Sequence, residues 1–409
     1  MSGVYNFDRA DCIIMAFFKI LKKSKKSKAR LGVISAKHGI IKTPAFVPVA
    51  TKGTLKGVLP RDVKTTGTQV AFVNTFHLVS HPGSEVVQKF GGIHNYTKLD
   101  LPLMSDSAGF QVFSLGAGKH TRQESQGKLR YAKSHEGEDV PVERITEEGV
   151  WFRSPRDGKK LLFTPETSVR HQKNIGADLI MAFDECIYYG AGHEYTKSAT
   201  NRTHRWLERC IKTFQKDPQK PGYRQYLYGI IQGGVFKDLR IDSAKFIAAQ
   251  PVDGIAIGGV SVGETKRELR EQVEWVTDYL PEGKPVHLLG VGHVDDIFDL
   301  IRYGIDTFDC VEPTRIARNG AVYQWKNGKK FTASAISKID LGKSKYIADK
   351  NPIQKGCKCY TCQNFSLSFL NHLFKERELV GYSLATIHNV RFFSDLFEEV
   401  RKAIRGGKI

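Results

Sequence analysis

Eight β-rich runs divide the sequence, and most of them are separated by segments with helical periodicity. The β-rich runs lie at 45–51, 69–76, 101–107, 177–185, 226–234, 253–259, 285–292 and 304–311. The clearest helical segments lie at 195–215, 235–249, 264–280 and 294–303. Alternating strands and helices predict a parallel sheet, and eight strands is the number that closes a β/α barrel. A doubly wound open sheet is the alternative that this pattern leaves open.

Nearly every one of these runs ends in a polar residue or a glycine. The ends are Thr51, Asn74 with His77, Asp106, Asp184 with Glu185, Gln232, Gly258 with Gly259, the stretch 290–293, and Asp309. A barrel gathers the carboxyl ends of its strands around one mouth. We therefore expect one pocket that holds three carboxylates, an amide and a glycine-lined wall. An open sheet would spread the same groups along a crevice.

The last run carries its carboxylate at the point where the strand must stop. Pro313 cannot continue a central strand, so period-2 alternation places Asp309 at the carboxyl end. Enzymes with α/β sheets and barrels place their chemistry at that end. The alternative is that Asp309 forms a structural ion pair with Arg315 or Arg318.

The chain is strongly basic. Lys and Arg number 62 against 43 Asp and Glu, which gives a net charge of +19. This balance indicates a polyanionic partner, nucleic acid first and an anionic membrane second, although a basic host proteome or a charged tail would also produce it. The basic run 19–30 is either a solvated face or an arm that touches RNA.

Targeting signals and nucleotide motifs are missing from the sequence. No stretch approaches the ~18 apolar residues of a membrane span. The short apolar stretch 12–18 is followed rather than preceded by its basic cluster, which is the reverse of a signal peptide. We therefore expect a cytoplasmic protein. Neither a Walker motif nor a dinucleotide-binding glycine motif follows a strand, which disfavours nucleotide chemistry.

Three of the seven cysteines crowd into one short segment. Cys357, Cys359 and Cys362, followed by His388, supply three thiolates and one imidazole. An odd cysteine count with this crowding favours a metal over a disulfide framework. Four protein ligands make a closed tetrahedral zinc site, which is structural because it leaves no position for water. His372 is the competing fourth ligand.

The interval 108–176 departs from the alternation of strands and helices. Its part 130–163 is typical of short strands with a turn at 157–158, so we expect inserted hairpins that form a flap over the mouth. The expected organisation is a basic extension at 1–30, a TIM-barrel catalytic domain at 31–322 with the hairpin insertion, and a zinc-binding subdomain with C-terminal helices at 323–409.

Several motifs together resemble one family over residues 30–401. They are NTFH at 74–77, SDSAGFQ at 105–111, FDEC at 183–186, IQGG at 231–234, AIGG at 256–259, GVG at 290–292, FDCV at 308–311, and TIHN at 386–389 with the cysteine cluster. The chain resembles the bacterial type of tRNA-guanine transglycosylase, the queuine tRNA-ribosyltransferase family. These enzymes exchange the wobble guanine of GUN-anticodon tRNAs for a 7-deazaguanine in queuosine biosynthesis. The resemblance also implies a β/α barrel, one structural zinc ion and a homodimer.

The resemblance assigns roles to individual residues. It implies that Asp309 is the nucleophile that forms a covalent RNA intermediate, and that Asp106 accepts the proton of the incoming base. It implies a base pocket formed by Asp106, Ser107, Ala108, Gly109, Phe110, Asp184, Gln232 and Gly259. It implies RNA contacts at Gly290, Val291, Gly292, His293, Val294, Asp295, Asp296, Thr314, Arg315, Ile316, Ala317 and Arg318.

The choice of inserted base depends on the loop 258–264. Val262 stands where queuine-using relatives have glycine, and its branched side chain would fill the space that queuine's substituent needs. This favours 7-aminomethyl-7-deazaguanine as the inserted base. Its ammonium group would need a hydrogen-bond acceptor, which a backbone carbonyl of this loop could supply with the aid of Glu264. Cys186 also matches the bacterial pattern. Val260 and the altered loop 187–190 could instead leave enough space for the substituent of queuine.

The chain also departs from the family pattern. Ala108 replaces a usual second glycine, the arginine that usually precedes the segment 81–83 is missing, and the segment 323–356 is longer than usual. Three alternatives stay open: an enzyme of the same family that inserts queuine, a non-catalytic tRNA-binding subunit, and an archaeal-type enzyme that acts on an internal guanine. The presence of Asp309 disfavours the second, and the short segment after His388 disfavours the third.

Overall fold

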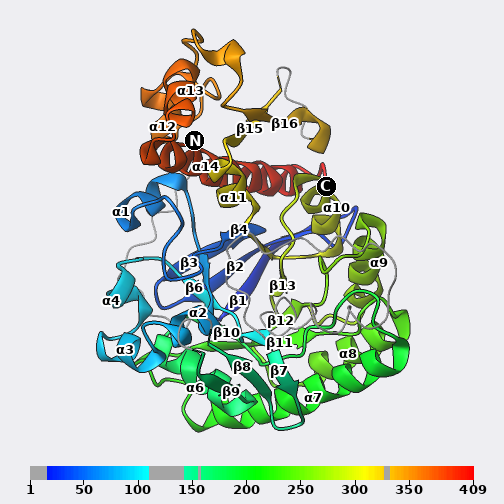
Figure 1. Cartoon of the computed structure of the whole chain (residues 1–409). Coiled ribbons are helices and arrows are strands. Elements are labelled where there is room, and N and C mark those ends of the chain that lie inside the picture. The colour runs from blue at the N-terminus through cyan, green and yellow to red at the C-terminus, as the bar shows by residue number, and fades with distance from the viewer. Residues whose placement is uncertain (1–15, 110–141, 155–157, 327–331) are drawn as a thin grey trace, which may run out of the picture.

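The computed structural model describes residues 16–109, 142–154, 158–326 and 332–409, and its centre is an eight-stranded parallel sheet (Figure 1). The strands are β4 (Ala45–Pro48), β5 (Ala71–Val73), β6 (Leu103–Ser105), β10 (Leu179–Met181), β11 (Tyr226–Ile231), β12 (Gly254–Ile257), β13 (Val286–Leu288) and β14 (Thr307–Cys310). Neighbouring strands follow one another along the chain, except that the first strand, β4, pairs with the last, β14. A parallel bridge between Val49 and Phe72 then joins the two edges of this order, at β4 and β5. The predicted β/α barrel is confirmed. The open-sheet alternative is wrong, because a doubly wound sheet reverses its strand order and keeps two free edges.

Helices connect the barrel strands. They are α1 (Pro60–Val63), α2 (Thr75–Ser80), α3 (Ser84–Lys89), α4 (Ile93–Thr97), α6 (Pro165–Ile175), α7 (His193–Lys216), α8 (Lys237–Ala249), α9 (Lys266–Thr277), α10 (Val294–Leu300) and α11 (Glu312–Arg318). The start of α6 is set by a capping box between Thr164 and Thr167, and that of α9 by one between Thr265 and Glu268. Three of the four predicted helical segments contain α8, α9 and α10, the last followed by the 3₁₀ turn Ile301–Tyr303, and the fourth, 195–215, lies within the longer α7.

A three-stranded antiparallel sheet closes the amino end of the barrel. It consists of β1 (Phe18–Lys23), β2 (Arg30–Ala36) and β3 (Gly39–Thr43). Ile34 and Ile41 are buried against residues from the barrel interior. β1 overlaps the start of the basic run 19–30, and most of its residues are exposed to solvent.

A second antiparallel sheet lies within the interval that was predicted to hold hairpins. Its strands are β7 (Val142–Ile145), β8 (Val150–Arg153) and β9 (Lys160–Phe163). Phe152 and Phe163 pack against Phe76 of α2, with ring centroids 5.3 and 6.1 Å away. The predicted turn residue Asp157 and the segment 110–141 lie outside the described residues.

The C-terminal region joins a small module to the barrel through one long helix. The module contains the hairpin β15 (Ala321–Trp325) and β16 (Ile336–Asp340), with α12 (Tyr360–Asn364) and α13 (Leu367–Lys375). Helix α14 (Leu379–Arg405) runs between the module and the barrel (Figure 1). Phe393 packs against Phe46 of β4, and Phe397 packs against Phe308 of β14.

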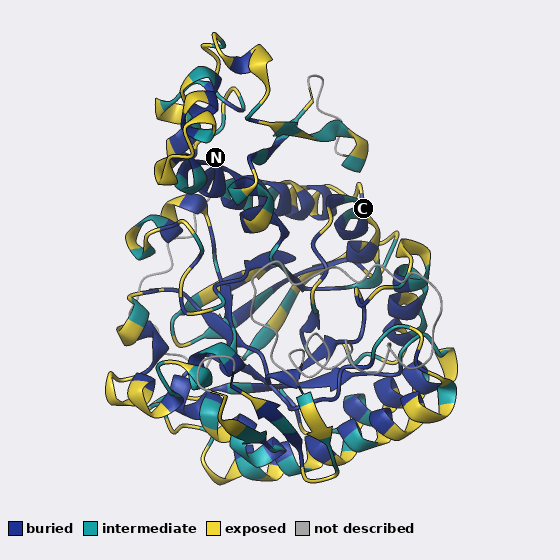
Figure 2. Cartoon of the chain, in the orientation of Figure 1, coloured by how far each residue is buried: buried dark blue, intermediate teal, exposed yellow. Residues whose placement is uncertain are grey.

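The distribution of buried residues matches this arrangement. The barrel strands are buried, whereas the surrounding helices alternate buried and exposed faces (Figure 2). Among the described residues, no helix combines the length and the hydrophobicity that a membrane crossing requires.

Candidate active site

Polar residues that follow neighbouring barrel strands contact one another at the carboxyl end of the barrel, which we call the mouth. Asn74, after β5, donates to the carboxylate of Asp106, after β6. The next residue, Ser107, donates to Asp184 Oδ1 over 2.9 Å. Gln232, after β11, donates from Nε2 to Asp184 Oδ2 over 2.8 Å. Two carboxylates and two amides from four strands therefore share one site.

Asp106 is held in a fixed orientation by its neighbours on α2. The backbone N–H of Thr75 donates to Asp106 Oδ1 over 2.6 Å, and the Thr75 hydroxyl donates to the Asp106 carbonyl over 2.6 Å. The residue is buried, with 7% of its surface exposed. A buried carboxylate that accepts hydrogen bonds from amides is oriented in advance for proton transfer.

The protein environment shifts the protonation of Asp184 strongly. Burial raises the pKa of Asp184 to about 6, although hydrogen bonds from Gln232 and Ser107 oppose this and the charge of Asp106 reinforces it. Two titratable carboxylates in one pocket with different environments are typical of sites with divided roles.

The backbone between these two carboxylates is tightly packed. A Cβ added at Gly109 would lie 2.1 Å from Asp184 Oδ1, so only glycine fits there. Ala108 adopts a left-handed φ of 74° and is fully buried. An alanine in this region of φ carries strain that a glycine would not. The predicted pocket residue Phe110 lies outside the described residues.

Asp309 lies next to the last residue of β14 and is held by β13 and the loop that follows it. Its Oδ1 accepts the Gly290 backbone N–H over 2.9 Å and lies 3.2 Å from His287 Nε2. The buried ion pair of this segment involves Asp306 instead, whose Oδ2 lies 2.6 Å from Arg30 Nη2 at the amino end. The contacts of Asp309 therefore differ from those of the structural ion pair that was considered as its alternative.

The two predicted RNA-contacting segments are joined at the mouth by an ion pair. His293 Nδ1, at the start of α10, lies 3.0 Å from Glu312 Oε2, at the start of α11. Members of the two segments with exposed or half-buried side chains include His293, Asp295, Ile316, Arg315 and Arg318. Buried members are Val291, Gly292, Val294, Asp296, Thr314 and Ala317. The buried members can shape this surface only through packing and backbone position.

The cysteine cluster and one histidine converge in the C-terminal module. The Sγ atoms of Cys362, Cys359 and Cys357 lie 3.2, 3.6 and 4.0 Å from His388 Nδ1. His388 Nε2 lies 2.7 Å from the Tyr323 carbonyl, which fixes the ring and leaves Nδ1 facing the thiols. These four donors could hold a metal ion. The competing ligand His372 is exposed on α13 and is not part of this group.

Comparison with known proteins gives a consistent result over almost the whole chain. A family model described as queuine tRNA-ribosyltransferase matches residues 24–409. A protein of that name from Herpetosiphon aurantiacus is 43% identical over 377 residues, covering 92% of this chain and 86% of the relative. One from Protochlamydia amoebophila is 42% identical and covers 95% of both chains. One from Psychrobacter cryohalolentis is 41% identical, covering 93% of this chain and 91% of the relative.

The chain belongs to the queuine tRNA-ribosyltransferase family. The predicted family is confirmed, and membership makes the chain a glycosyltransferase-type enzyme. The non-catalytic alternative is thereby disfavoured.

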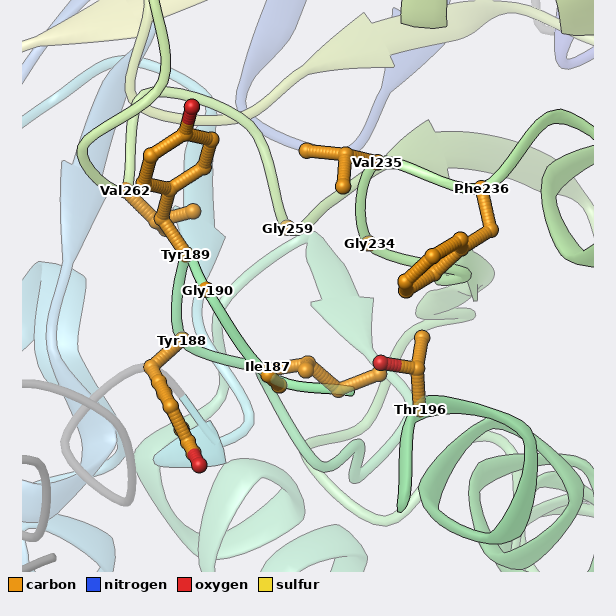
Figure 3. A pocket seen from close by; sticks show the side chains of 11 residues that line it. Ile187, Tyr188, Tyr189, Gly190, Thr196, Gly234, Val235, Phe236, Gly259 and Val262 are labelled. Carbon is orange, nitrogen blue, oxygen red and sulfur yellow. The ribbon is translucent and has the colours of Figure 1, made fainter. Parts of the chain in front are cut away.

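In this family member, the loop 187–190 packs against the loop that carries Val262. Side chains of both loops surround a cavity of about 10 Å³ that also touches Gly259 and Thr196 (Figure 3), which is room for about one water molecule. Tyr189 donates its hydroxyl to Glu268 Oε1 over 3.1 Å. The altered loop therefore leaves little open space beside Val262.

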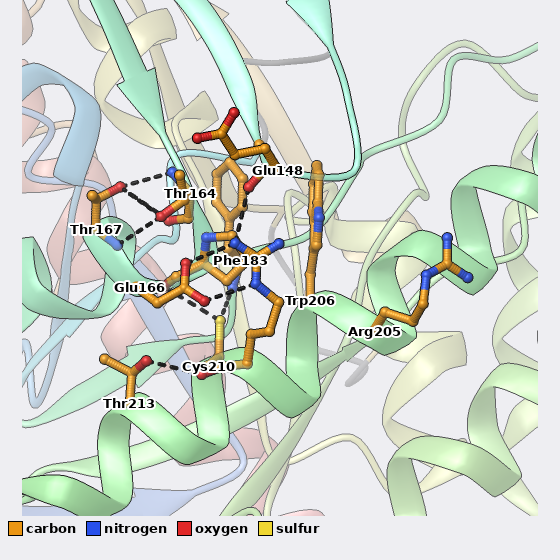
Figure 4. Close-up of polar contacts among 12 residues, drawn as sticks. Glu148, Thr164, Glu166, Thr167, Phe183, Arg205, Trp206, Cys210 and Thr213 are labelled. Atoms are coloured by element: carbon orange, nitrogen blue, oxygen red, sulfur yellow. Dashed lines mark hydrogen bonds and ion pairs between the residues drawn. The ribbon is translucent and has the colours of Figure 1, made fainter.

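Helix α7 supports the wall that carries Asp184. Phe183 stacks on Trp206 with ring centroids 4.9 Å apart and donates its N–H to Cys210 Sγ (Figure 4). Trp206 Nε1 also donates to the Glu147 carbonyl, in the turn between β7 and β8, over 2.8 Å. One helix thus fixes both the residue before Asp184 and the inserted sheet.

Three features of the site were missed by sequence reasoning. His287, beside Asp309, is a lone polar residue in an apolar strand, and alternation could have placed it inside the barrel. Arg240 and Glu312 looked like ordinary helical charges, although both are buried. No local pattern reveals the partners that such side chains find across the fold.

The structure also brings together His38, His94 and Asp178 at the amino end, far from the mouth. His38 Nδ1 lies 2.8 Å from Asp178 Oδ1, and His94 Nε2 lies 3.1 Å from Oδ2. The two imidazoles stack with centroids 3.4 Å apart and planes 14° from parallel. His38 is hydrogen-bonded to Asp178, His94 lies at ion-pair distance from the same carboxylate, and the three groups could also hold a metal ion.

Proposed function

We propose that this protein exchanges the wobble guanine of GUN-anticodon tRNAs for a 7-deazaguanine, as a tRNA-guanine transglycosylase in queuosine biosynthesis. The observation that carries this proposal is the placement of Asp106, Asp184 and Asp309 at the ends of three strands of one barrel. Membership of a family whose named relatives are queuine tRNA-ribosyltransferases supports it. The base must leave its stack to reach such a pocket.

Asp309 acts as the nucleophile. Both of its hydrogen-bond contacts among the described residues fall on Oδ1, which leaves Oδ2 to attack C1′ of the ribose. The bond from Asp309 to C1′ forms as the glycosidic bond to guanine breaks, and a second displacement by the incoming base reverses the process with net retention. The N–H of Gly290 keeps the carboxylate aimed throughout.

Asp106 accepts the proton that the incoming base loses as it forms its bond to the ribose. The amide of Asn74 and the N–H of Thr75 hold the carboxylate in place. These contacts hold the carboxylate oxygens in the fixed orientation that a general base needs.

Asp184 recognises the base. The ionised carboxylate can accept the ring N–H and the exocyclic amino group of guanine together. Gln232 and the N–H of Gly259 supply donors for the base carbonyl. Ser107, Ala108 and Gly109 form the adjoining backbone wall. Phe110 stays a predicted member of this pocket.

The inserted base is 7-aminomethyl-7-deazaguanine rather than queuine. Val262 is nearly buried and fills the wall beside Gly259 (Figure 3). Glu264 accepts the N–H groups of Ser261 and Val262. Because N–H and C=O of one trans peptide point in opposite directions, the Val260 carbonyl points away from Glu264 and can accept the ammonium of the base.

The RNA backbone is held by the basic surface around the mouth. Arg315 and Arg318 on α11, with His293 at the start of α10, contact nucleotides that flank the target. The ion pair with Glu312 raises the pKa of His293, so its imidazolium adds positive charge towards phosphate. The net charge of +19 supports an RNA partner.

The donor set of the C-terminal module fits zinc, which Cys357, Cys359, Cys362 and His388 would hold as one structural ion per chain. Metal analysis should give one zinc, which His388→Ala releases and His372→Ala keeps. The reverse result would overturn this ligand set. We also propose the domain boundaries that were assigned from the sequence. The protein is further proposed to be a homodimer and to be located in the cytoplasm. Reduced metal-binding thiols and a tRNA substrate support that location.

The test is base exchange. The protein is incubated with radiolabelled guanine and anticodon stem-loops that carry guanine or adenine at the wobble position. We expect label to enter only the guanine stem-loop. Binding without incorporation would identify a non-catalytic tRNA-binding subunit.

The proposed base preference is tested by competition between the aminomethyl base and queuine. The unmodified protein should prefer the aminomethyl base, and Val262→Gly should shift the preference towards queuine. A cost of ~1–3 kcal/mol for the extra atoms predicts roughly a tenfold to hundredfold preference. Equal use of both bases by the unmodified protein would refute the steric argument.

A further inference from the structure

Arg240 lies on α8 beneath the mouth and is completely buried. Arginine is almost never fully buried unless it is paired with an acid. Its described hydrogen-bond partners are instead neutral oxygens: the carbonyls of Gly234, Gly258 and Gly259 at 2.7, 2.6 and 2.6 Å, and Gln272 Oε1 at 2.7 Å.

The three carbonyl acceptors belong to the loops that follow two adjacent barrel strands, and Gln272 lies on α9. Gly234 closes the loop after β11, which begins with Gln232, and Gly258 and Gly259 form the turn after β12. The loop after β11 is packed directly on α8, because a Cβ at Gly233 would lie 2.6 Å from the Arg240 backbone nitrogen. One planar guanidinium therefore sets the position of one loop relative to the other.

The hydrogen bonds also determine where the backbone donors of the second loop point. Arg240 Nη1 holds the Gly258 carbonyl, so the Gly259 N–H of the same peptide points away from Arg240. Gly259 has a left-handed φ of 61°, and a Cβ there would lie 2.3 Å from Gln232 Oε1. The turned backbone thus places the Gly259 amide beside the Gln232 amide.

We infer that Arg240 is a positioning residue for base recognition, which makes Gln232 and the Gly259 N–H converge on the carbonyl of the bound base. This inference rests on the proposed function and adds a residue that does not itself touch the substrate. Arg240→Lys keeps a charge but cannot donate to three carbonyls in one plane. The geometry of base binding should therefore loosen while the RNA surface stays intact.

The test measures KM for guanine and for tRNA separately in Arg240→Lys. We expect the guanine KM to rise about tenfold or more and the tRNA KM to stay within about twofold. In Arg240→Ala, added guanidinium ion should partly restore the guanine KM. Equal changes in both KM values, or an unchanged guanine KM, would overturn the inference.

The matched control is Arg401, a second buried arginine that donates to backbone carbonyls, those of Pro44 and Lys42. Arg401→Lys should lower the melting temperature without changing the guanine KM. If Arg240→Lys does not fold, Gln272→Met is the second variant, because Gln272 accepts from Arg240 Nη2. It should raise the guanine KM about threefold, and an unchanged value would refute the inference.

Guanine binding measured by calorimetry separates this inference from the proposed function. If the unmodified protein binds guanine but does not exchange it, the function fails, and a weaker affinity in Arg240→Lys still supports the positioning role. If the unmodified protein exchanges guanine and Arg240→Lys binds it equally well, the positioning role alone fails. A protein that neither binds nor exchanges guanine would overturn both.

Discussion

The two ends of the barrel both bury aspartates, but they give them different partners. At the amino end, Asp306 lies 2.6 Å from the Arg30 guanidinium, and Asp178 is contacted by two imidazoles, those of His38 and His94. At the mouth, Asp184 accepts hydrogen bonds from the neutral donors Ser107 and Gln232.

The partners decide what each carboxylate can do. Burial alone would raise the pKa of Asp178, but hydrogen bonds from His38 and His94 outweigh it and hold the pKa at about 2. Burial raises the pKa of Asp184 to about 6, because its donors compensate only in part. At Asp306 burial outweighs the contact with Arg30, so its pKa is raised as well, and this carboxylate is committed to the fold by its ion pair. Asp184, which has only neutral donors, can still exchange a proton or accept a ligand.

Asp309→Asn should produce the largest effect. The amide cannot attack the ribose, so base exchange should fall by roughly a thousandfold or more, equivalent to over 4 kcal/mol of barrier. The melting temperature should change little, because the described contacts of Asp309 are the Gly290 N–H and the His287 imidazole, and neither is a lysine or arginine side chain. Exchange and trapping of the RNA adduct measure the effect. An adduct that survives denaturation in this variant would refute the assignment.

Asp306→Asn, three residues earlier, should show the opposite pattern. Removing this carboxylate leaves Arg30 buried without its charged partner, which costs about 3–5 kcal/mol of unfolding free energy. Exchange by the folded fraction should persist, since Asp306 faces the amino end. Urea unfolding together with exchange assays measures both. A variant that is stable but inactive would contradict the assignment of a structural role to the amino end and a catalytic role to the mouth.

The sequence predicted the barrel because strand ends and helical segments carry local signals. It also pointed to Asp106, Asp184 and Asp309, since a carboxylate at the end of an apolar run is visible without any contact. The sequence did not reveal which aspartate of the last β-rich run, Asp306 or Asp309, would form an ion pair with an arginine. Asp306 directly precedes β14 and Asp309 lies within it, and only the tertiary fold brings Arg30 to the first and Gly290 to the second.

Partners that come from distant segments explain the other omissions. The cluster of His38, His94 and Asp178 joins a hairpin, a short helix and the start of a strand. Arg240 is followed by apolar and polar residues that suit any surface helix, and its burial depends on how two loops fold over it. Periodicity predicts elements, but it does not determine which buried charges meet.

Asp184→Asn should stabilise the protein while removing base recognition. Because the folded pKa lies above the unfolded value of about 3.9, ionisation of Asp184 lowers stability as pH rises from about 4 to about 6. At pH 7 the variant should gain on the order of 2–3 kcal/mol. Unfolding measured from pH 7 to pH 5 should show this gain shrinking.

The same carboxylate should control activity in wild-type protein. Its ionised form accepts the base, so the guanine KM should rise as pH falls below about 6. Asp178, with its pKa held at about 2, should instead contribute stability that is full above pH 4 and is lost only as pH falls towards 2. A guanine KM that is flat between pH 5 and 7 would contradict the role of Asp184.

Ala108→Gly should have the smallest effect, and its sign is the informative part. Ala108 sits at the mouth with a φ of 74°, where a left-handed backbone costs an L-residue about 1–2 kcal/mol. Glycine removes that strain but adds unfolded-state freedom worth about 0.4–1 kcal/mol, so unfolding free energy should rise by about 1 kcal/mol or less.

Ala71→Gly is the control, because Ala71 is equally buried but starts β5 with an ordinary backbone. That variant should lose about 1 kcal/mol. If urea unfolding shows the same loss for both variants, the mouth holds no strain at Ala108.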